Sequence, residues 1–219
     1  QNVAIGRQAL DANTTGKNCV AVGHDTLSAN TTAEENTALG SFALNANTTG
    51  AANTAVGNFA MINNTTASNN TAVGRGALGN NTTGSENVAV GHLTLDANTT
   101  GTDNTAIGQN ALTTNTTGAS NTAVGKNALK VCLDGGGNVA VGHTAGLDLT
   151  DGNANTFVGL RAGQNITTSS NNVAIGINSM EDATTSGECT CVGTNAGANL
   201  TSGSNNLLLG KEAGKSGQP

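Results

Sequence analysis

One glycine recurs every 17 residues along the whole chain, and no insertion interrupts this spacing. Each of these glycines closes a motif whose usual form is Asn-(Thr/Val)-Ala-(Val/Ile/Leu)-Gly. They are Gly6, Gly23, Gly40, Gly57, Gly74, Gly91, Gly108, Gly125, Gly142, Gly159, Gly176, Gly193 and Gly210. Loops between independent elements vary in length, whereas one extra residue in a stacked coil would break its pairing with the next. The constant spacing therefore predicts thirteen repeats that stack as the coils of a solenoid.

We number each repeat from its glycine, so that Gly40 is position 0 and Leu44 is position +4. Positions +14 to +16, as in residues 37–39 and 88–90, show the alternation of a short strand. Positions +7 to +10 usually read Asn-Thr-Thr-Gly, in which Asn and Thr support turns and Gly allows positive φ. Seventeen residues are too few for a helix and two loops. The pattern predicts an all-β, parallel β-solenoid whose coils each contain two short strands and tight corners.

The composition excludes the main alternatives to a solenoid. Aromatic residues make up 1% of the 219 residues, so a compact core would lack the large side chains that fill a protein interior. Disordered chains are rich in Pro and charge, whereas this chain has one Pro and 10% charged residues. Collagen is excluded because Gly does not recur at every third position. A repetitive fold with a thin, linear core is left.

The aliphatic residues expected in the interior change position along the chain. Position +4 is Leu or Met in the first eight repeats, as at Leu44 and Leu78, and becomes Gly in four of the last five. Where the coil continues after such a Gly, position +7 is aliphatic, at Leu149, Ile166 and Leu200. We interpret the two positions as alternative ways to fill one interior volume. This divides the solenoid into an Asn-Thr-Thr-Gly subtype over 1–130 and an Ala-Gly subtype over 131–219.

Asparagine forms the most regular polar columns. Position +13 is Asn in eleven repeats, and stacked amides can bond from coil to coil. The structural residues predicted from the polar and glycine columns are Asn36, Asn53, Asn70, Asn87, Gly40, Gly57, Gly74 and Gly91. The Asn-Thr-Thr stretches also match the N-glycosylation pattern, whose use depends on the host.

Charge and motifs argue against several classes of function. The net charge of −6 comes from acids and bases scattered singly, so no basic patch favours nucleic acid. No apolar run approaches the roughly 20 residues of a membrane span. The sequence offers no Ser/His/Asp or Cys/His constellation and no phosphate-binding loop. We therefore expect neither enzymatic activity nor a cofactor.

Histidine and cysteine are the residue types that could form a metal site or a disulfide bridge. His24, His92 and His143 all occupy position +1, which also holds Arg and Lys, so we expect surface residues there. Cys19 and Cys189 replace the Asn at +13 ten coils apart, too far to pair within one chain. We expect buried thiols that replace small residues, with bridging between chains as the alternative.

The repeated Asn-(Thr/Val/Ser)-Ala-(Ile/Val)-Gly motif, as in residues 2–6 and 172–176, resembles the head repeats of trimeric autotransporter adhesins of the YadA type. The motif Asn-Asn-Thr-Ala-Val-Gly is also similar to repeats of phage tail fibres. The resemblance implies a left-handed parallel β-roll that assembles as a homotrimer and presents an adhesive surface. The 17-residue period is longer than that of the usual adhesin head repeat.

The alanines suggest a route to such an assembly. Positions +3 and +15 are predominantly Ala, and two columns of small residues would permit close approach of a neighbouring chain. A bundle of parallel chains would also compensate for the thin core of each one. We therefore expect self-association through the Ala columns.

The leading functional hypothesis is an adhesive segment of a trimeric surface fibre, either an adhesin head or a phage tail fibre. Its expected location is extracellular, on a cell surface or a virion, and its expected target is a host surface protein, matrix protein or glycan. The chain starts at Gln1 without Met or a signal peptide, so we expect a piece of a longer fibre. End-to-end polymerisation into a filament is the alternative. Ice binding by the threonine files at +8 and +9 is a further one, disfavoured because these residues lie in a corner.

Overall fold

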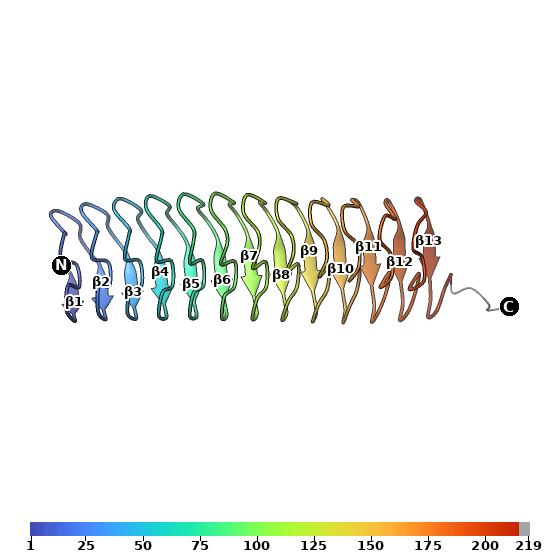
Figure 1. Ribbon diagram of the computed structural model, residues 1–219, viewed down its shortest axis with the longest axis horizontal. Coiled ribbons are helices and arrows are strands. Elements are labelled where there is room, and N and C mark those ends of the chain that lie inside the picture. Colours follow the sequence, from blue (N-terminus) through green and yellow to red (C-terminus); the bar gives the residue numbers. More distant parts are fainter. Residues whose placement is uncertain (215–219) are drawn as a thin grey trace. The chain divides into compact units, whose positions relative to one another are not determined.

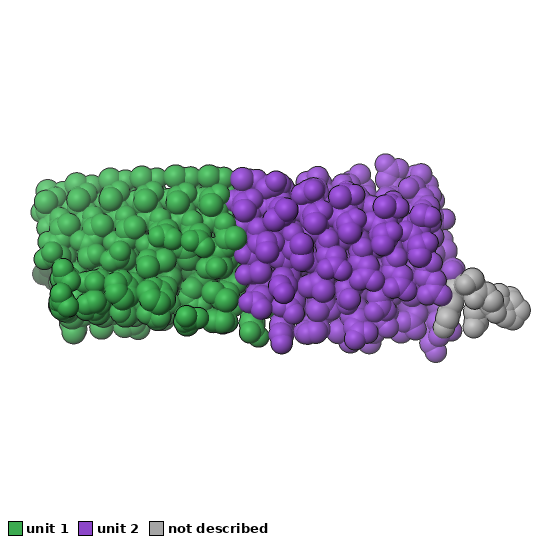
Figure 2. Space-filling view, viewed as in Figure 1, with its two compact units in different colours: residues 1–109 green, residues 110–219 purple. Residues whose placement is uncertain are grey.

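The computed structural model describes residues 1–214, and its regular elements are thirteen strands of three residues each, with no helix in that range. The strands are β1 (Val3–Ile5), β2 (Val20–Val22), β3 (Thr37–Leu39), β4 (Thr54–Val56), β5 (Thr71–Val73), β6 (Val88–Val90), β7 (Thr105–Ile107), β8 (Thr122–Val124), β9 (Val139–Val141), β10 (Thr156–Val158), β11 (Val173–Ile175), β12 (Thr190–Val192) and β13 (Leu207–Leu209) (Figure 1). Two compact units, 1–109 and 110–219, contain β1–β7 and β8–β13 (Figure 2).

Consecutive strands pair in parallel within each unit, always at the same register. Ala38 lies opposite Ala55 and Ala55 opposite Ala72, one full repeat apart. The second unit continues the same pattern, with Ala140 opposite Phe157 and Phe157 opposite Ala174. The parallel β-solenoid with one coil per repeat is therefore confirmed.

The expectation of two strands per coil was wrong: each described coil has one, at +14 to +16. The remainder consists of turns, because positions +2, +4 and +12 have positive φ, for example 61° at Phe42 and 50° at Leu44. Such residues cannot form an extended strand. Their backbone still bonds along the stack, since the Phe42 N–H donates to His24 O (2.9 Å) and the Leu44 N–H donates to Ala60 O (3.0 Å).

The interior of each coil is lined by positions +3, +4 and +15. Leu44 and Leu78 at +4 are fully buried, and so are Ala43 at +3 and Ala38 at +15. The Ala columns therefore lie inside the single chain and cannot bring a second chain close. This corrects the expected route to self-association: small residues are needed here because the two walls of the coil meet across its interior.

In the late coils the interior is filled differently. Leu149 and Ile166 are fully buried, as expected, while Leu200 is partly exposed. A Cβ built on Gly146 or Gly163 would lie 2.7 or 2.5 Å from the ring of Phe157, which replaces Ala at +15. Exchange between +4 and +7 is thus only part of the repacking, because Phe157 occupies the space beside both glycines.

Two files of buried asparagine bind successive coils together. At +13, Asn36 Oδ1 accepts from the Asn53 N–H (2.9 Å), and Asn36 Nδ2 donates to Gly50 O (2.8 Å). The same pair of bonds recurs from Asn53 and Asn70 onward, and Asn87 is likewise fully buried. At +7 the amides bond one another, as in Asn47 Nδ2 to Asn30 Oδ1 (3.1 Å). Most coils therefore carry buried amides whose partners lie in a neighbouring coil.

The glycines at position 0 mark the closest approach between coils. Gly40, Gly57, Gly74 and Gly91 have φ between 133° and 140°. A Cβ on Gly57 would lie 2.5 Å from Gly74 O, and real Cβ atoms do not approach backbone this closely. The backbones at this position stack without room for a side chain.

The amide files predict that Asn70→Asp will destabilise the fold by about 2–4 kcal/mol, because a buried donor becomes a charged acceptor facing Gly84 O. The neighbouring Asn69→Asp is the control, since Asn69 is exposed and Asp tolerates its positive φ. Chemical denaturation followed by circular dichroism measures both. Equal midpoints for the two variants would contradict the structural role of the file.

The glycine column predicts that Gly57→Ala will lower the free energy of unfolding by at least about 3 kcal/mol, because the added methyl group would displace the backbone of the next coil. Gly137→Asn is the matched control. Gly137 also has positive φ, but a Cβ there has its nearest neighbour at 3.9 Å, and other coils carry Asn at this +12 position. Thermal unfolding should separate the two variants by many degrees; similar melting temperatures would refute this explanation of the 17-residue period.

Candidate interaction surface

The outer face of the strands is an aliphatic surface that we call the sheet face, formed by positions +14 and +16. Strand alternation buries +15 and turns its two neighbours outward. At +16, Leu39, Val73 and Ile107 in the first unit are 47%, 36% and 40% exposed, and Val141 and Ile175 repeat the pattern in the second. Exposed aliphatic side chains repeated at one spacing, with Val and Thr beside them at +14, make this face a candidate interaction site.

The chemistry of the sheet face is uniform. Position +14 holds only Val, Thr and one Leu, and position +16 only Val, Ile and Leu. Neither column contains a charged residue. A second copy of the same face would therefore meet no charge repulsion at its centre.

Charges of opposite sign border the sheet face at its two ends. Position +1, just after the strand, carries bases and no acid, whereas position +12, just before it, carries acids and no base. The charged side chains at +1 are Arg7, Arg75, Lys126 and Lys211, and those at +12 are Glu35, Glu86, Asp103 and Glu188. All eight are exposed. The charges occur in some coils only, but wherever they occur the bases lie at the +1 edge and the acids at the +12 edge.

The three histidines lie at the basic edge with separate partners. His24 Nδ1 is 3.4 Å from Asp25 Oδ2, and its ring contacts Phe42 edge-on at 5.2 Å between centroids. His92 Nε2 is 3.2 Å from Arg75 Nη1, and His143 is exposed. Among residues 1–214, no group of three or more His, Cys, Asp or Glu side chains could hold a metal ion.

All four cysteines are free and buried. Cys19 Sγ donates to Ala33 O (3.5 Å), and Cys132 Sγ donates to Gly135 O (3.6 Å), the same carbonyl positions that Asn side chains bind in other coils. The thiol therefore replaces the amide donor. Because the sulfurs face the interior, bridging between chains would require the coil to open.

The acidic residues near the subtype junction do not converge on a site. The Asp134 carboxylate accepts from Thr117 Oγ1 (2.7 Å) and Thr116 Oγ1 (2.9 Å). These two hydrogen bonds lower the pKa of Asp134. The two hydroxyls hold the Asp134 side chain against the +8 and +9 threonines of the preceding coil.

The threonine file at +8 donates its hydroxyls to the protein itself. Thr14 Oγ1 bonds Thr31 O (2.9 Å), and Thr48 Oγ1 bonds Thr65 O (3.1 Å), one coil further on. The second unit repeats this arrangement, for example from Thr150 to Thr167 O (3.0 Å). These donors hold the corner together, and the file at +9 is the more exposed one.

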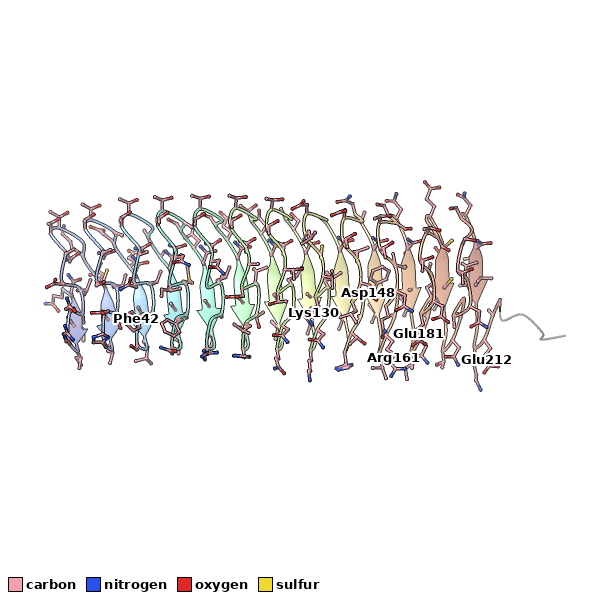
Figure 3. All side chains as sticks on the ribbon, viewed as in Figure 1. Phe42, Lys130, Asp148, Arg161, Glu181 and Glu212 are labelled. Atoms are coloured by element: carbon pink, nitrogen blue, oxygen red, sulfur yellow. The ribbon has the colours of Figure 1, made fainter. Side chains whose placement is uncertain are left out.

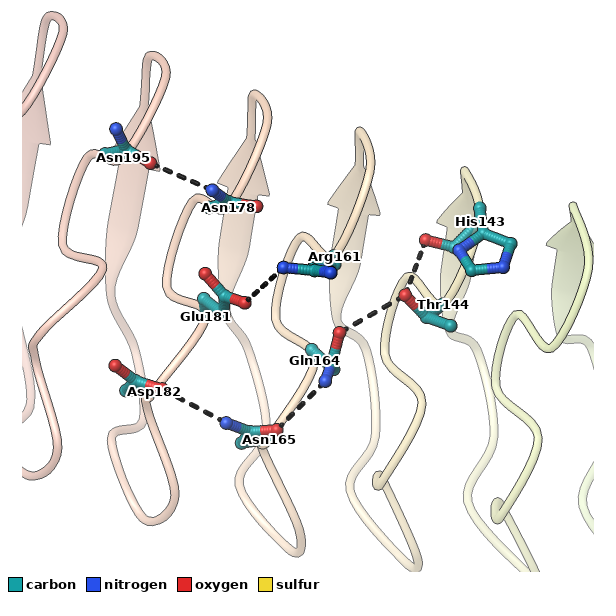
Figure 4. Close-up of polar contacts among 9 residues, drawn as sticks. All are labelled: His143, Thr144, Arg161, Gln164, Asn165, Asn178, Glu181, Asp182 and Asn195. Carbon is teal, nitrogen blue, oxygen red and sulfur yellow. Dashed lines mark hydrogen bonds and ion pairs between the residues drawn. The ribbon is translucent and has the colours of Figure 1, made fainter.

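Side chains at +2, +5 and +6 form polar ladders over the turn surface of the second unit (Figures 3 and 4). Arg161 pairs with Glu181 across one coil at 3.4 Å, and Asn178 Nδ2 donates to Asn195 Oδ1 (3.1 Å). Such exposed contacts contribute about 0–1 kcal/mol each. Their effect is to cover the turns, because each side chain contacts the one above or below.

No family model, curated protein or solved structure matches this chain. Residues 1–214 contain no helix of the length and apolarity needed to cross a membrane. The sheet face was missed as an interaction surface by sequence reasoning, which assigned that role to the Ala columns. The signal was present in the flanking Val, Ile and Thr at +14 and +16.

Buried thiols predict a loss of stability at alkaline pH. Burial raises the pKa of Cys132 to about 11 and that of Cys191 to about 11, so the folded state disfavours the thiolate. Their contribution to stability is complete below the ordinary pKa of about 8.5 and is lost as the pH rises from there to about 11. Denaturant midpoints measured across this range should fall. Cys132→Asn, which restores the residue of the first seven coils, should reduce the slope; an unchanged slope would contradict the assignment.

Proposed function

We propose that this chain is an adhesive segment of an extracellular fibre, built by side-by-side association of identical chains through the sheet face. The observation that carries the proposal is an uncharged aliphatic face bordered by bases on one edge and acids on the other. Burying exposed Val, Ile and Leu side chains contributes about 25 cal/mol per Å². The repeated face offers many such contacts at one spacing.

The two charged edges favour parallel chains. When two sheet faces pack with their chains running in the same direction, the +1 edge of one chain lies beside the +12 edge of its neighbour. When the chains run in opposite directions, +1 meets +1 and +12 meets +12. Complementary edges select orientation more than they add affinity. The sequence thus supports a parallel assembly, and the resemblance to adhesin and tail-fibre repeats suggests three chains in left-handed coils.

Association through the sheet face leaves the turn surface to face outward. In the second unit that surface carries polar contacts between successive coils, as those of Arg161, Asn165 and Asn178 show (Figure 4). A stiff array of this type suits contact with a host surface protein, matrix protein or glycan on a cell surface or at a virion. End-to-end polymerisation is the alternative, and it would produce a ladder of masses in place of one oligomer.

The proposal predicts that Leu39→Lys, Val73→Lys and Ile107→Lys, combined in one variant, will convert the oligomer into single chains, because each lysine places a charge in the buried interface. The matched control places lysine at Thr32, Thr66 and Thr100, which are exposed at the +9 corner of the preceding turn. Mass photometry reads the result directly. A wild-type protein that is a single chain, or two variants that behave alike, would refute association through this face.

The same preparation tests the orientation of the chains. A spin label on a cysteine introduced at Thr32, or separately at Thr100, reports the distance between copies, since the buried native thiols will react slowly. Parallel chains place both sites at equal heights, so the two distances should agree. A large difference between them would show opposed chains.

A further inference from the structure

A single coil of the first unit lacks side chains at both +2 and +5 on its turn surface. Position +2 is Gly only at Gly76, and position +5 is Gly only at Gly79. The same two positions of the flanking coils hold Phe59 and Ile62 on one side and Leu93 and Asp96 on the other. The result is a notch one coil high, a cavity of about 150 Å³ lined by these six residues with Arg75 and Asn80 at its rim.

Neither glycine is required by the backbone. Gly79 does not have positive φ, and the positive φ of Gly76 is adopted at +2 by Phe42, Phe59 and Leu93. A Cβ on Gly76 would lie 2.9 Å from Leu93 Cδ2 and 3.8 Å from Asp96 Oδ1, and a Cβ on Gly79 would lie 2.5 Å from Asp96 Oδ1. These neighbours are the ends of side chains that can move. The solenoid could therefore carry side chains here, as the other coils do, and the notch is not a consequence of the fold.

The walls of the notch present an open aromatic face. Phe59 stacks on Phe42 on one side, with 5.4 Å between ring centroids. On its other side the next coil offers Gly76 and no side chain, and Leu93 follows one coil later. The Leu93 side chain reaches over Gly76, because its Cδ2 lies 2.9 Å from where a Cβ on that glycine would be. The notch is therefore bounded by the face of Phe59 turned away from Phe42 and by the Leu93 side chain.

Polar groups in the notch complement hydroxyl groups. The Asp96 carboxylate is half-buried and accepts a hydrogen bond from the Gly79 N–H, and a Cβ on Gly79 would lie 2.5 Å from its Oδ1. Burial raises the pKa of Asp96, with His92 and the Gly79 N–H acting in the opposite direction. Asn80 Oδ1 accepts from Asn63 Nδ2 (3.0 Å), which orients the amide at the rim. A partly desolvated carboxylate gains most from a ligand that donates to it.

We propose that this notch binds one pyranose ring of a host glycan, with the C–H face of the sugar on Phe59 and its hydroxyls donating to Asp96. A pyranose combines an apolar face with hydroxyls at its rim, which is the combination that the notch presents. The cavity is smaller than the roughly 300–1,000 Å³ of sites for larger ligands, so one ring is its limit. A simple ammonium ion fits less well, because Arg75 shares the rim.

This inference rests on the adhesive function proposed above. It also explains how a parallel assembly would strengthen binding. One such notch binds weakly, with a Kd on the order of millimolar. Parallel copies would place identical notches at the same height, and linked sites gain avidity by 10²-fold or more.

Saturation-transfer NMR with the methyl pyranosides of glucose, galactose, mannose and N-acetylglucosamine tests the site on the whole chain. We expect signal from at least one sugar, and its loss when Gly76→Asn and Gly79→Thr fill the notch with residues that other coils carry at +2 and +5. Asn127→Ser with Lys130→Thr, at the same positions of a distant coil, should leave the signal unchanged. No signal with any of the four sugars, or signal retained in the filled variant, would overturn the proposal.

Two milder variants keep the test valid if the filled notch disturbs the coil. Phe59→Leu retains an apolar wall without the aromatic face, and Asp96→Asn retains a polar side chain without the charge; each should weaken binding at least fivefold. Binding unaffected by both would also overturn the site. The lysine variant of the sheet face should still bind sugar, because none of its substitutions touches the notch. Loss of oligomers and loss of sugar binding are thus separate results.

Discussion

The stacking of backbone on backbone at position 0 is the constraint on which the rest of this structure depends. At Gly57 there is no room for a Cβ beside the next coil, and from there the parallel ladder runs through β4 and β5 in fixed register. A change of one residue in repeat length would turn every inward side chain outward. The 17-residue spacing is constant because every coil must keep this register with the next.

A coil this narrow is stabilised mainly by bonds to its neighbours and only secondarily by apolar packing. Leu44 illustrates the balance: the left-handed conformation costs a bulky residue about 1–2 kcal/mol, while full burial contributes about 1.5–3 kcal/mol. The net gain is small, so replacing Leu by Gly at +4 is tolerable when Phe157 fills the space. The buried amides of Asn36, Asn53 and Asn70 supply directional bonds that the aliphatic residues cannot.

Most of the architecture followed from the sequence because it depends on period and alternation. The strands at +14 to +16, the buried Leu149 and Ile166 and the amide file at +13 could all be predicted in this way. The second strand was wrongly expected, because Phe and Leu, the residue types at positions 42 and 44, do not indicate positive φ. Strand alternation predicts that the Ala38 side chain lies on one face of the strand and those of Thr37 and Leu39 on the other. It does not predict which of the two faces is buried. That ambiguity led to the Ala columns being assigned to the surface.

In a repeat protein the fold explains what recurs, so residues that break the pattern require another explanation. Cys19 and Cys132 break it while keeping the contact, because each thiol takes over the hydrogen bond of the asparagine it replaces. Phe157 breaks it to fill an interior gap. Gly76 and Gly79 differ from both: they remove two side chains from the surface, and only the ends of Leu93 and Asp96 reach into the space. An aromatic face is left beside a half-buried carboxylate. Exceptions that restore a hydrogen bond or fill the interior belong to stability, whereas the two glycines leave a cavity at the surface, which is the feature that the proposed sugar site uses.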